Sequence, residues 1–314
     1  MNLKHWSVYF ALLMGTCASS YAGILTLRQD PETGAIRVFR EGGDVAIMTQ
    51  NAAPGFRPYI HPILSPDGKG VLTELSPSHH VHQTGVYWGF TRANGRDYFG
   101  NPGNGYWHRV SCLPLISKGD AVQWETVYQM LDEAGGVVMI ETQRWTLRDT
   151  GDRYFLELQW TGEAVTDVTI GNYFYGGLFV RMPWHKGIES AAVNSIGQRN
   201  RAADSQRALW VDVAMAIEGR DDWGHIAIFA HPQNPDFPQP WRVDKNQGVG
   251  PSRAKLGGWK INKGEKDAYQ HQLVIYTGEL NDGQLNEDWL QYSGEKTLPP
   301  SSVWPGGVIT SKKP

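Results

Sequence analysis

Two histidines separated by one residue, His80 and His82, are the first feature of this sequence that could do chemistry. On an extended strand, side chains at this spacing point to the same face, so the two imidazoles would lie close together. Imidazole titrates near neutral pH and also binds divalent metals, so the pair suits proton transfer or metal ligation. A divalent metal bound by His80 and His82, a metal-free sugar pocket and structural hydrogen bonding all stay open. A third metal ligand would have to come from distant sequence: His61, Glu74, Asp97 or His231.

A second stretch carries Arg57, Tyr59 and His61 at alternate positions, which places the three side chains on one face of a strand. We expect His61 and Tyr59 to act as acid–base partners of the histidine pair. Arg57 would hold an oxygen-rich or anionic group of a ligand. The other side chains expected at a substrate are Gln83, Tyr87, Asp97, Trp107, Arg181, His231 and Trp241.

Aromatic residues are unusually frequent, with 13 Trp and 13 Tyr in the chain. Aromatic rings stack on the apolar faces of sugars, although most rings of a β-rich protein belong to its core. We expect Tyr87, Trp107 or Trp241 to touch a ligand. His231 opens a loop with four prolines, which fix the backbone as a binding site requires.

The first 22 residues are typical of a secretory signal peptide. A basic start at Lys4 precedes an apolar stretch, Trp6–Met14, and Ser20-Tyr21-Ala22 fits a cleavage site. The apolar stretch is shorter than the roughly twenty residues of a membrane span. Cleavage would leave one cysteine, Cys112, so we expect a periplasmic or extracellular bacterial protein without an internal disulfide. Lipoprotein processing at Cys17 is the less favoured alternative.

Net charge is -3 with no basic face, which argues against nucleic acid as a partner.

The elements that must position these residues are mostly strands. A period of two predicts strands at Ile24–Gln29, Ile36–Arg40, Val122–Met130, Val137–Leu147, Tyr154–Trp160, Val168–Tyr173, Gly177–Arg181, Ala208–Ala214, His225–Ala230 and Tyr269–Tyr276. One helix is predicted at Asn281–Tyr292. We therefore expect one all-β antiparallel sandwich domain over residues 23–295 and a loosely ordered tail over residues 296–314.

Several motifs together resemble a secreted bacterial family designated PmoA-like. They are RPYIHPI with PDG, HHVHQTGVYWGF followed by NGRD, YGGL with Arg181, and IAIFAHPQNP leading to Trp241. Many members carry the run DHPHHRG, of which His80 and His82 match two histidines while Gln83 replaces the third. The resemblance implies a sandwich like that of galactose mutarotase and a setting in carbohydrate metabolism. The methane-oxygenase label is rejected, because no membrane-spanning segment follows the signal.

Three functions compete on these grounds. The first is a secreted hydrolase or lyase that acts on a glycoside or uronic-acid-type sugar through histidine acid–base chemistry or a His-bound metal. The second is a non-catalytic glycan-binding protein, and the third is a sugar epimerase or mutarotase. All three take a saccharide as partner, and the sequence leaves its identity and the oligomeric state open.

Overall fold

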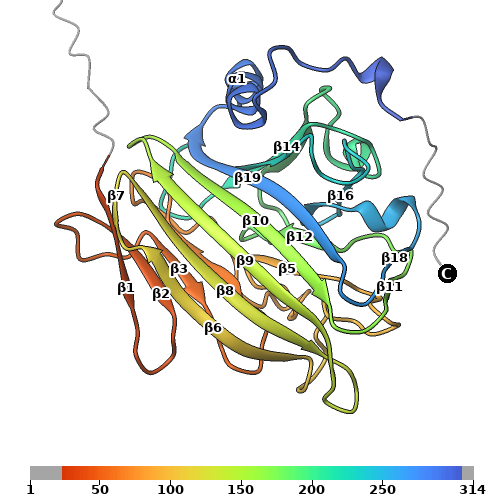
Figure 1. The fold of residues 1–314 in the computed structure, drawn as a ribbon. Coiled ribbons are helices and arrows are strands. Elements are labelled where there is room, and N and C mark those ends of the chain that lie inside the picture. The colour runs from red at the N-terminus through yellow and green to blue at the C-terminus, as the bar shows by residue number, and fades with distance from the viewer. Residues whose placement is uncertain (1–22, 306–314) are drawn as a thin grey trace, which may run out of the picture.

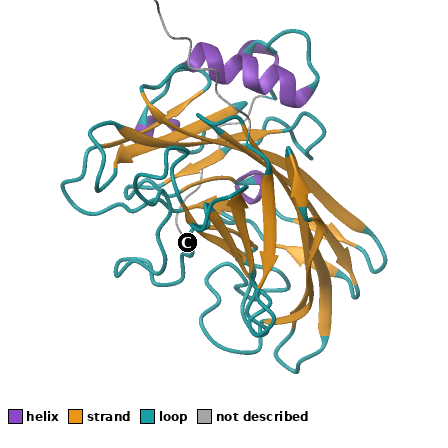
Figure 2. Cartoon of the chain, turned by 90° about the vertical axis from the view of Figure 1, so that its left-hand side faces the viewer, coloured by secondary structure: helices purple, strands orange, loops and turns teal. Residues whose placement is uncertain are grey.

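A computed structural model describes residues 23–305 of the chain. The predicted signal peptide, its cleavage site at Ala22 and Cys17 lie outside these residues. The strands form two large sheets that pack face to face, and every strand pairing is antiparallel (Figures 1 and 2). The predicted all-β sandwich is confirmed. None of the helices in the described part of the chain has the length and apolarity needed to cross a membrane.

The first sheet has nine strands, in the order β16-β17-β12-β5-β4-β3-β2-β1-β7. Its strands are β1 (Leu25–Gln29), β2 (Ile36–Arg40), β3 (Met48–Asn51), β4 (Tyr59–Ile63), β5 (Val86–Gly89), β7 (Lys118–Gly119), β12 (Gly177–Val180), β16 (Trp241–Val243) and β17 (Val249–Pro251).

The second sheet has eight strands, in the order β13-β14-β15-β19-β10-β9-β8-β6. Its strands are β6 (Trp107–Ile116), β8 (Ala121–Leu131), β9 (Val137–Asp149), β10 (Tyr154–Ala164), β13 (Ser190–Asn194), β14 (Trp210–Ala216), β15 (Trp223–Ala230) and β19 (Lys266–Gly278). A small third sheet pairs β11 (Val168–Ile170) with β18 (Trp259–Ile261). Three short 3-10 helices complete the elements: Asn200–Ala203, Arg253–Leu256 and Ser301–Val303.

Strict alternation builds the core between the two sheets. Along β8 every second side chain is buried, and the neighbouring strands β9 and β10 repeat the pattern, as the predicted meander requires. The two layers meet at large rings, where Trp88 of β5 stacks on Trp160 of β10 with ring centroids 4.4 Å apart. Side chains on the opposite faces of both sheets are therefore free to build sites.

The predicted helix is α1 (Asp282–Ser293), and it covers part of the outer face of the eight-stranded sheet (Figure 1). Asn281 caps its first turn by accepting a hydrogen bond from the backbone of Gln284 at 3.0 Å. Its Leu285 and Trp289 are buried against outward-facing apolar side chains of β14, β15 and β19. Trp304, in the predicted tail, packs against the same cluster.

Glu141 is a buried acid within the core, 1% exposed on the inner face of β9. The Trp160 indole donates to its Oε2 at 2.9 Å, and Gln143 donates to its Oε1 at 2.8 Å. Burial raises the pKa of Glu141 from 4.5 to about 7. The folded state therefore favours the protonated acid, and this contribution to stability is fully present below pH 4.5 and lost as pH rises through about 7.

Replacing Glu141 with leucine should remove this pH dependence. We expect the stability difference between the wild type and Glu141→Leu to shift by roughly 3 kcal/mol against the wild type from about pH 5 to pH 8. Thermal melts of both proteins across this range measure it, because all other titrating groups are common to the two. A difference that stays constant with pH would show that Glu141 does not titrate in the folded protein.

Candidate functional site

A row of aromatic side chains crosses the outer face of the nine-stranded sheet. Tyr87 of β5 lies opposite Tyr59 of β4 on one side and opposite Phe179 of β12 on the other. Val86 and Trp88, the neighbours of Tyr87, belong to the core, so the row points away from the sandwich. This aromatic row is the floor on which the candidate site stands.

A pocket of about 50 Å³ lies beside this floor. It is lined by His80, His82, Gln83, Phe99, Tyr175, Phe179, Arg242 and Asp244. Four separate parts of the chain meet there: the turn before β5, the loop after β5, the segment that leads into β12 with β12 itself, and β16 with the loop after it. We call it the histidine pocket.

His80 and His82 do converge, but the local geometry differs from the prediction. Residues 78–82 form turns rather than a strand, so the expected strand alternation is wrong. The turn nevertheless brings the two rings edge to face, with centroids 5.7 Å apart. His80 Nδ1 is buried and has no hydrogen-bond partner among the described residues, so it is available to a ligand. The His79 ring packs edge to face on His80 at 5.0 Å and on Trp184 at 5.3 Å.

Arg57 anchors this turn from below. It is fully buried, and its guanidinium donates to the backbone carbonyls of His82 and of Phe99, the latter at 2.7 Å. The guanidinium also lies 4.1 Å from the ring centroid of Tyr87, a cation–π contact. The expectation that Arg57 holds a ligand is therefore replaced by a positioning role, because its side chain is not exposed.

A second buried guanidinium, Arg181, ties the turn to the loop after β16. It donates to the Gln83 side chain, to the Asn246 carbonyl and to Asp244 Oδ2, the last at 3.0 Å. Asp244 Oδ1 accepts from the backbone of Asn246 and Gly248 at 2.8 and 2.9 Å. A Cβ at Gly248 would meet Asp244 and Phe179 at 2.6 Å, so only glycine fits there. Arg181 and Gln83, expected at the substrate, thus build the wall of the pocket.

The electrostatic environment keeps both imidazoles neutral. Burial, reinforced by the Arg57 charge, lowers the pKa of His82 from 6.5 to about 4. Burial and the Arg181 charge also lower the pKa of His80. A neutral imidazole can accept a proton, so the pair is poised as a general base at neutral pH.

Tyr59 and Tyr87 lie in the aromatic floor rather than at the pocket lining. Tyr87 is fully buried, and its hydroxyl has no hydrogen-bond partner in the described part of the chain. His61 is not among the pocket residues either. Its Nδ1 lies 3.0 Å from Thr73 Oγ1, and burial lowers its pKa. Asp97 accepts from the Gly100 backbone at 2.7 Å, and burial raises its pKa, so it shapes the neighbouring loop.

Three other expected contacts lie elsewhere. Trp107 and Trp241 are core residues, 2% and 0% exposed, and cannot stack on a ligand. The Trp241 indole donates to the Ala208 carbonyl at 3.0 Å. His231 lies beside α1, in a hollow on the outer face of the other sheet. The single-sequence pattern could not tell which face of the sandwich each of these side chains would take.

The metal alternative lacks a ligand set. Over residues 23–305, no three side chains of His, Cys, Asp or Glu gather in a way that could hold a metal ion. Cys112 is buried in β6, and burial raises its pKa to about 12, so its thiol is unsuited to act as a nucleophile.

The sequence prediction did not assign five of the pocket residues to the site: Phe99, Tyr175, Phe179, Arg242 and Asp244. Arg242 and Asp244 are the charged ones. Both follow Trp241 in the proline-rich stretch, where the sequence predicts that Trp241 contacts the ligand. Alternation along β16 buries Trp241 and turns Arg242 outward, which is the signal that would have found it. The Arg242 side chain is 27% exposed and lies 3.4 Å from Asp204.

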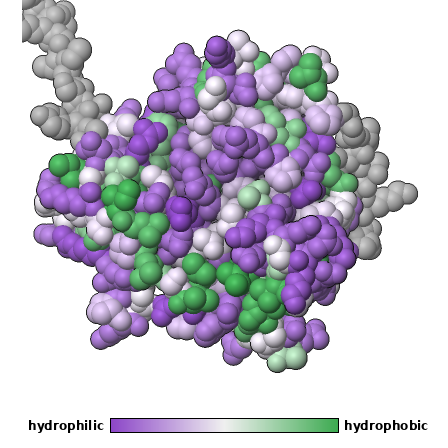
Figure 3. All heavy atoms as spheres, in the orientation of Figure 1, coloured by the Kyte–Doolittle hydropathy of each residue, from purple (hydrophilic) through white to green (hydrophobic). Residues whose placement is uncertain are grey.

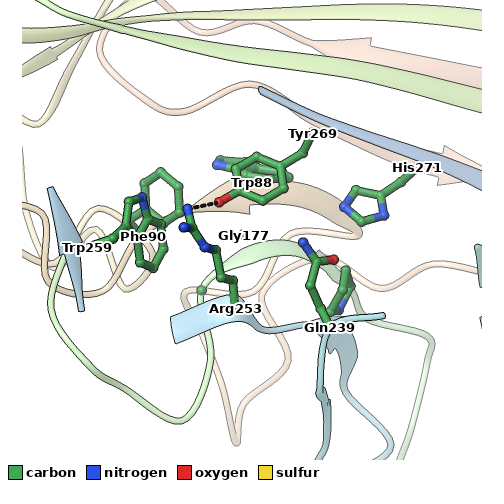
Figure 4. A pocket seen from close by; sticks show the side chains of 10 residues that line it. Trp88, Phe90, Gly177, Gln239, Arg253, Trp259, Tyr269 and His271 are labelled. Atoms are coloured by element: carbon green, nitrogen blue, oxygen red, sulfur yellow. Dashed lines mark hydrogen bonds between the residues drawn. The ribbon is translucent and has the colours of Figure 1, made fainter. Parts of the chain in front are cut away.

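A separate hollow of about 10 Å³ lies within the sandwich and is shown in Figure 4. Trp88, Tyr269 and His271 face it from the two sheets, and Arg253 donates to the Tyr269 hydroxyl at 3.1 Å (Figure 4). His271 Nδ1 lies 3.1 Å from the Phe229 carbonyl, and burial lowers its pKa to about 4. Trp88, Tyr269 and His271 are almost fully buried, so they belong to the polar interior of the core.

The fold and the pocket define a class: an antiparallel β-sandwich that carries a small polar pocket on the outer face of one sheet. Residues 42–290 match the family described as a family of unknown function, DUF6807, and the chain belongs to this family. A search of curated proteins found no match.

Solved structures similar to this chain include galactosidases and a mutarotase-related enzyme. The galactosidase domain of an α-galactosidase–sucrose kinase has a TM-score of 0.38 and 10% identity, over 80% of this chain and 41% of that one. A GH36 α-galactosidase from Geobacillus stearothermophilus in complex with stachyose has a TM-score of 0.37 and 10% identity, over 60% and 30%. A galactose mutarotase related enzyme from Lactobacillus acidophilus has a TM-score of 0.36 and 7% identity, over 82% and 98%. This chain thus spans less than half of the two galactosidase chains.

Proposed function

We propose that this protein is a carbohydrate-active enzyme that acts outside the cytosol by proton transfer on a uronic-acid-type sugar. The observation that carries the proposal is the convergence of two neutral imidazoles, His80 and His82, with Arg242 and Asp244 in one pocket. An imidazole base and a nearby guanidinium match the needs of a sugar whose carboxylate acidifies the adjacent carbon.

Of the hydrolase and lyase expected from the sequence, the pocket favours the lyase. Two-acid hydrolysis requires a pair of carboxyl groups across the glycosidic bond, and Asp244 is the one carboxyl among the residues that line the pocket. Asp244 is moreover engaged by Arg181. In the elimination, one histidine takes the proton from the carbon next to the carboxylate. A carbon–carbon double bond forms as the bond from the next carbon to the glycosidic oxygen breaks, and that oxygen takes a proton from water.

The test is a turnover assay on oligomers of glucuronic, galacturonic, mannuronic and guluronic acid. The wild type should release an unsaturated product that absorbs in the ultraviolet. The double variant His80→Ala/His82→Ala should lose at least about 100-fold in rate, the usual loss when a general base is removed. His108→Ala is the matched control, because His108 is exposed on β6 of the other sheet and its replacement should leave the rate unchanged.

Two results would contradict the proposal. One is a double variant that keeps full activity while its thermal melt matches the wild type. The other is the absence of any unsaturated product from all four substrates. Proton NMR on the same mixtures identifies anomer interconversion or epimerisation, which would assign the pocket to a sugar isomerase instead.

A further inference from the structure

A second polar hollow, of about 300 Å³, lies on the outer face of the opposite sheet beside α1. Glu157 of β10 with Gln270 and Gln272 of β19 form its floor. Gln291 and Tyr292 of α1 form one wall, and His231 from the loop after β15 adds to the lining. We call it the glutamine groove. Figure 3 shows that the face over β9, β10 and β19 is largely hydrophilic.

The strand register explains why these side chains gather. Glu157 lies directly opposite Gln272 on the paired strand. The neighbours of Glu157, Leu156 and Leu158, are fully buried in the core, so Glu157 must point outward. Gln272 lies opposite Phe229 on its other side, and Phe229 packs in the cluster under α1. The glutamine groove therefore lies at the edge of the apolar cluster that α1 covers.

One buried polar group of the groove has no protein partner. The Tyr292 hydroxyl makes no hydrogen bond within residues 23–305. Gln272, which also lines the groove, is only 4% exposed. A buried hydroxyl is normally hydrogen-bonded, so the Tyr292 hydroxyl indicates a ligand that supplies a donor or an acceptor.

His231 adds an oriented group to the lining. Its Nδ1 accepts a hydrogen bond from the Gln233 backbone at 3.2 Å, which leaves the proton on Nε2. Burial lowers the pKa of His231, which favours the neutral ring. Its ring meets Tyr292 edge to face at 5.1 Å, so both rings are held in place. The groove thus offers fixed donors, fixed acceptors and aromatic surface together.

We propose that the glutamine groove is a second carbohydrate-binding site, which takes a neutral sugar unit of a polysaccharide. Amides both donate and accept, as sugar hydroxyls do, and aromatic edges suit the apolar face of a sugar ring. Arg148 and Glu157 in the lining carry opposite charges, and the lining carboxylate of Asp288 is paired with Arg153 at 2.8 Å, which matches a neutral ligand. None of the strongly exposed large hydrophobic residues lines the groove, whereas the centre of a protein interface needs apolar anchors.

Affinity electrophoresis tests this proposal, in gels that contain hydroxyethylcellulose, xylan or galactomannan. The wild type should be retarded in at least one gel, and Gln272→Ala should weaken binding about tenfold or more. Tyr292→Phe removes only the hydroxyl and should also weaken binding, so the test survives if Gln272→Ala misfolds. Gln129→Ala changes the same residue type on β8 outside the groove and should migrate like the wild type.

This second site shares with the proposed function only the assumption that the ligand is a carbohydrate. Each of the two proposals can therefore be contradicted without the other. His82→Ala, in the other pocket, should keep full retardation in these gels. Unretarded wild type in all three gels would overturn the second site, and so would unchanged retardation of both groove variants. Loss of retardation in His82→Ala alone would place the sugar in the histidine pocket and would also overturn it.

Discussion

Replacing Asp244 with alanine is expected to lower the free energy of unfolding by about 3–5 kcal/mol, the usual cost of leaving one partner of a buried ion pair uncompensated. Arg181 is fully buried, and the Asp244 carboxylate at 3.0 Å is its one ion-pair partner among the described residues. The same carboxylate also organises the loop after β16 through the backbone of Asn246 and Gly248. Denaturant unfolding at neutral pH measures the loss.

A matched control separates burial from charge. Glu41 forms an ion pair with Lys118 at 2.6 Å, and both side chains are about half exposed. Glu41→Ala should therefore cost no more than about 1 kcal/mol. Asp244→Asn keeps the acceptor for the loop amides but removes the charge, so it should fall between the two. Equal losses for the Asp244 and Glu41 variants would show that the Arg181 pair is not held away from solvent.

The rate of the proposed reaction should hold on the acid side of neutrality and fall only as pH drops through about 4. The cause is the pKa of His82, which burial and Arg57 lower to about 4, so the base stays neutral down to that pH. An unperturbed imidazole would instead lose activity near pH 6.5. The measurement is the pH dependence of kcat/KM on the best substrate of the turnover assay.

Folding must be followed in the same samples, because the lowered pKa also affects stability. His82 favours the folded state above pH 6.5, and that contribution is lost as pH falls through about 4. Circular dichroism at each pH shows whether the protein is still folded where activity declines. An acid limb centred near pH 6.5, in folded protein, would mean that His82 is not the base.

The regular part of this fold could be predicted because its signals are local. The alternation in β8, β9 and β10 follows from residues two apart, and the cap at Asn281 follows from residues three apart. The short strands β16 and β17 could not be predicted in the same way, because each has three residues, too few for an alternation to stand out, and β17 pairs with the distant β12.

The site could be predicted only in part, for the same reason. His80 and His82 were found by their spacing, although a turn rather than a strand brings the rings together. Asp244 enters the pocket through its bond to Arg181, 63 residues away in the chain, which no local pattern reveals. Trp241 was assigned to a ligand because tryptophan often contacts sugars, whereas its neighbour Arg242 takes the outward position.

The contact between Arg57 and the turn at residues 78–82 has a consequence for engineering. Arg57 donates a hydrogen bond to the backbone carbonyl of His82 and not to its ring, and Val81 in the same turn is 67% exposed. This contact therefore does not depend on the identity of the side chains in the turn. Libraries that vary positions 79 to 82 should yield folded proteins with altered chemistry. The side chains of the turn can therefore be exchanged while the rest of the fold stays the same.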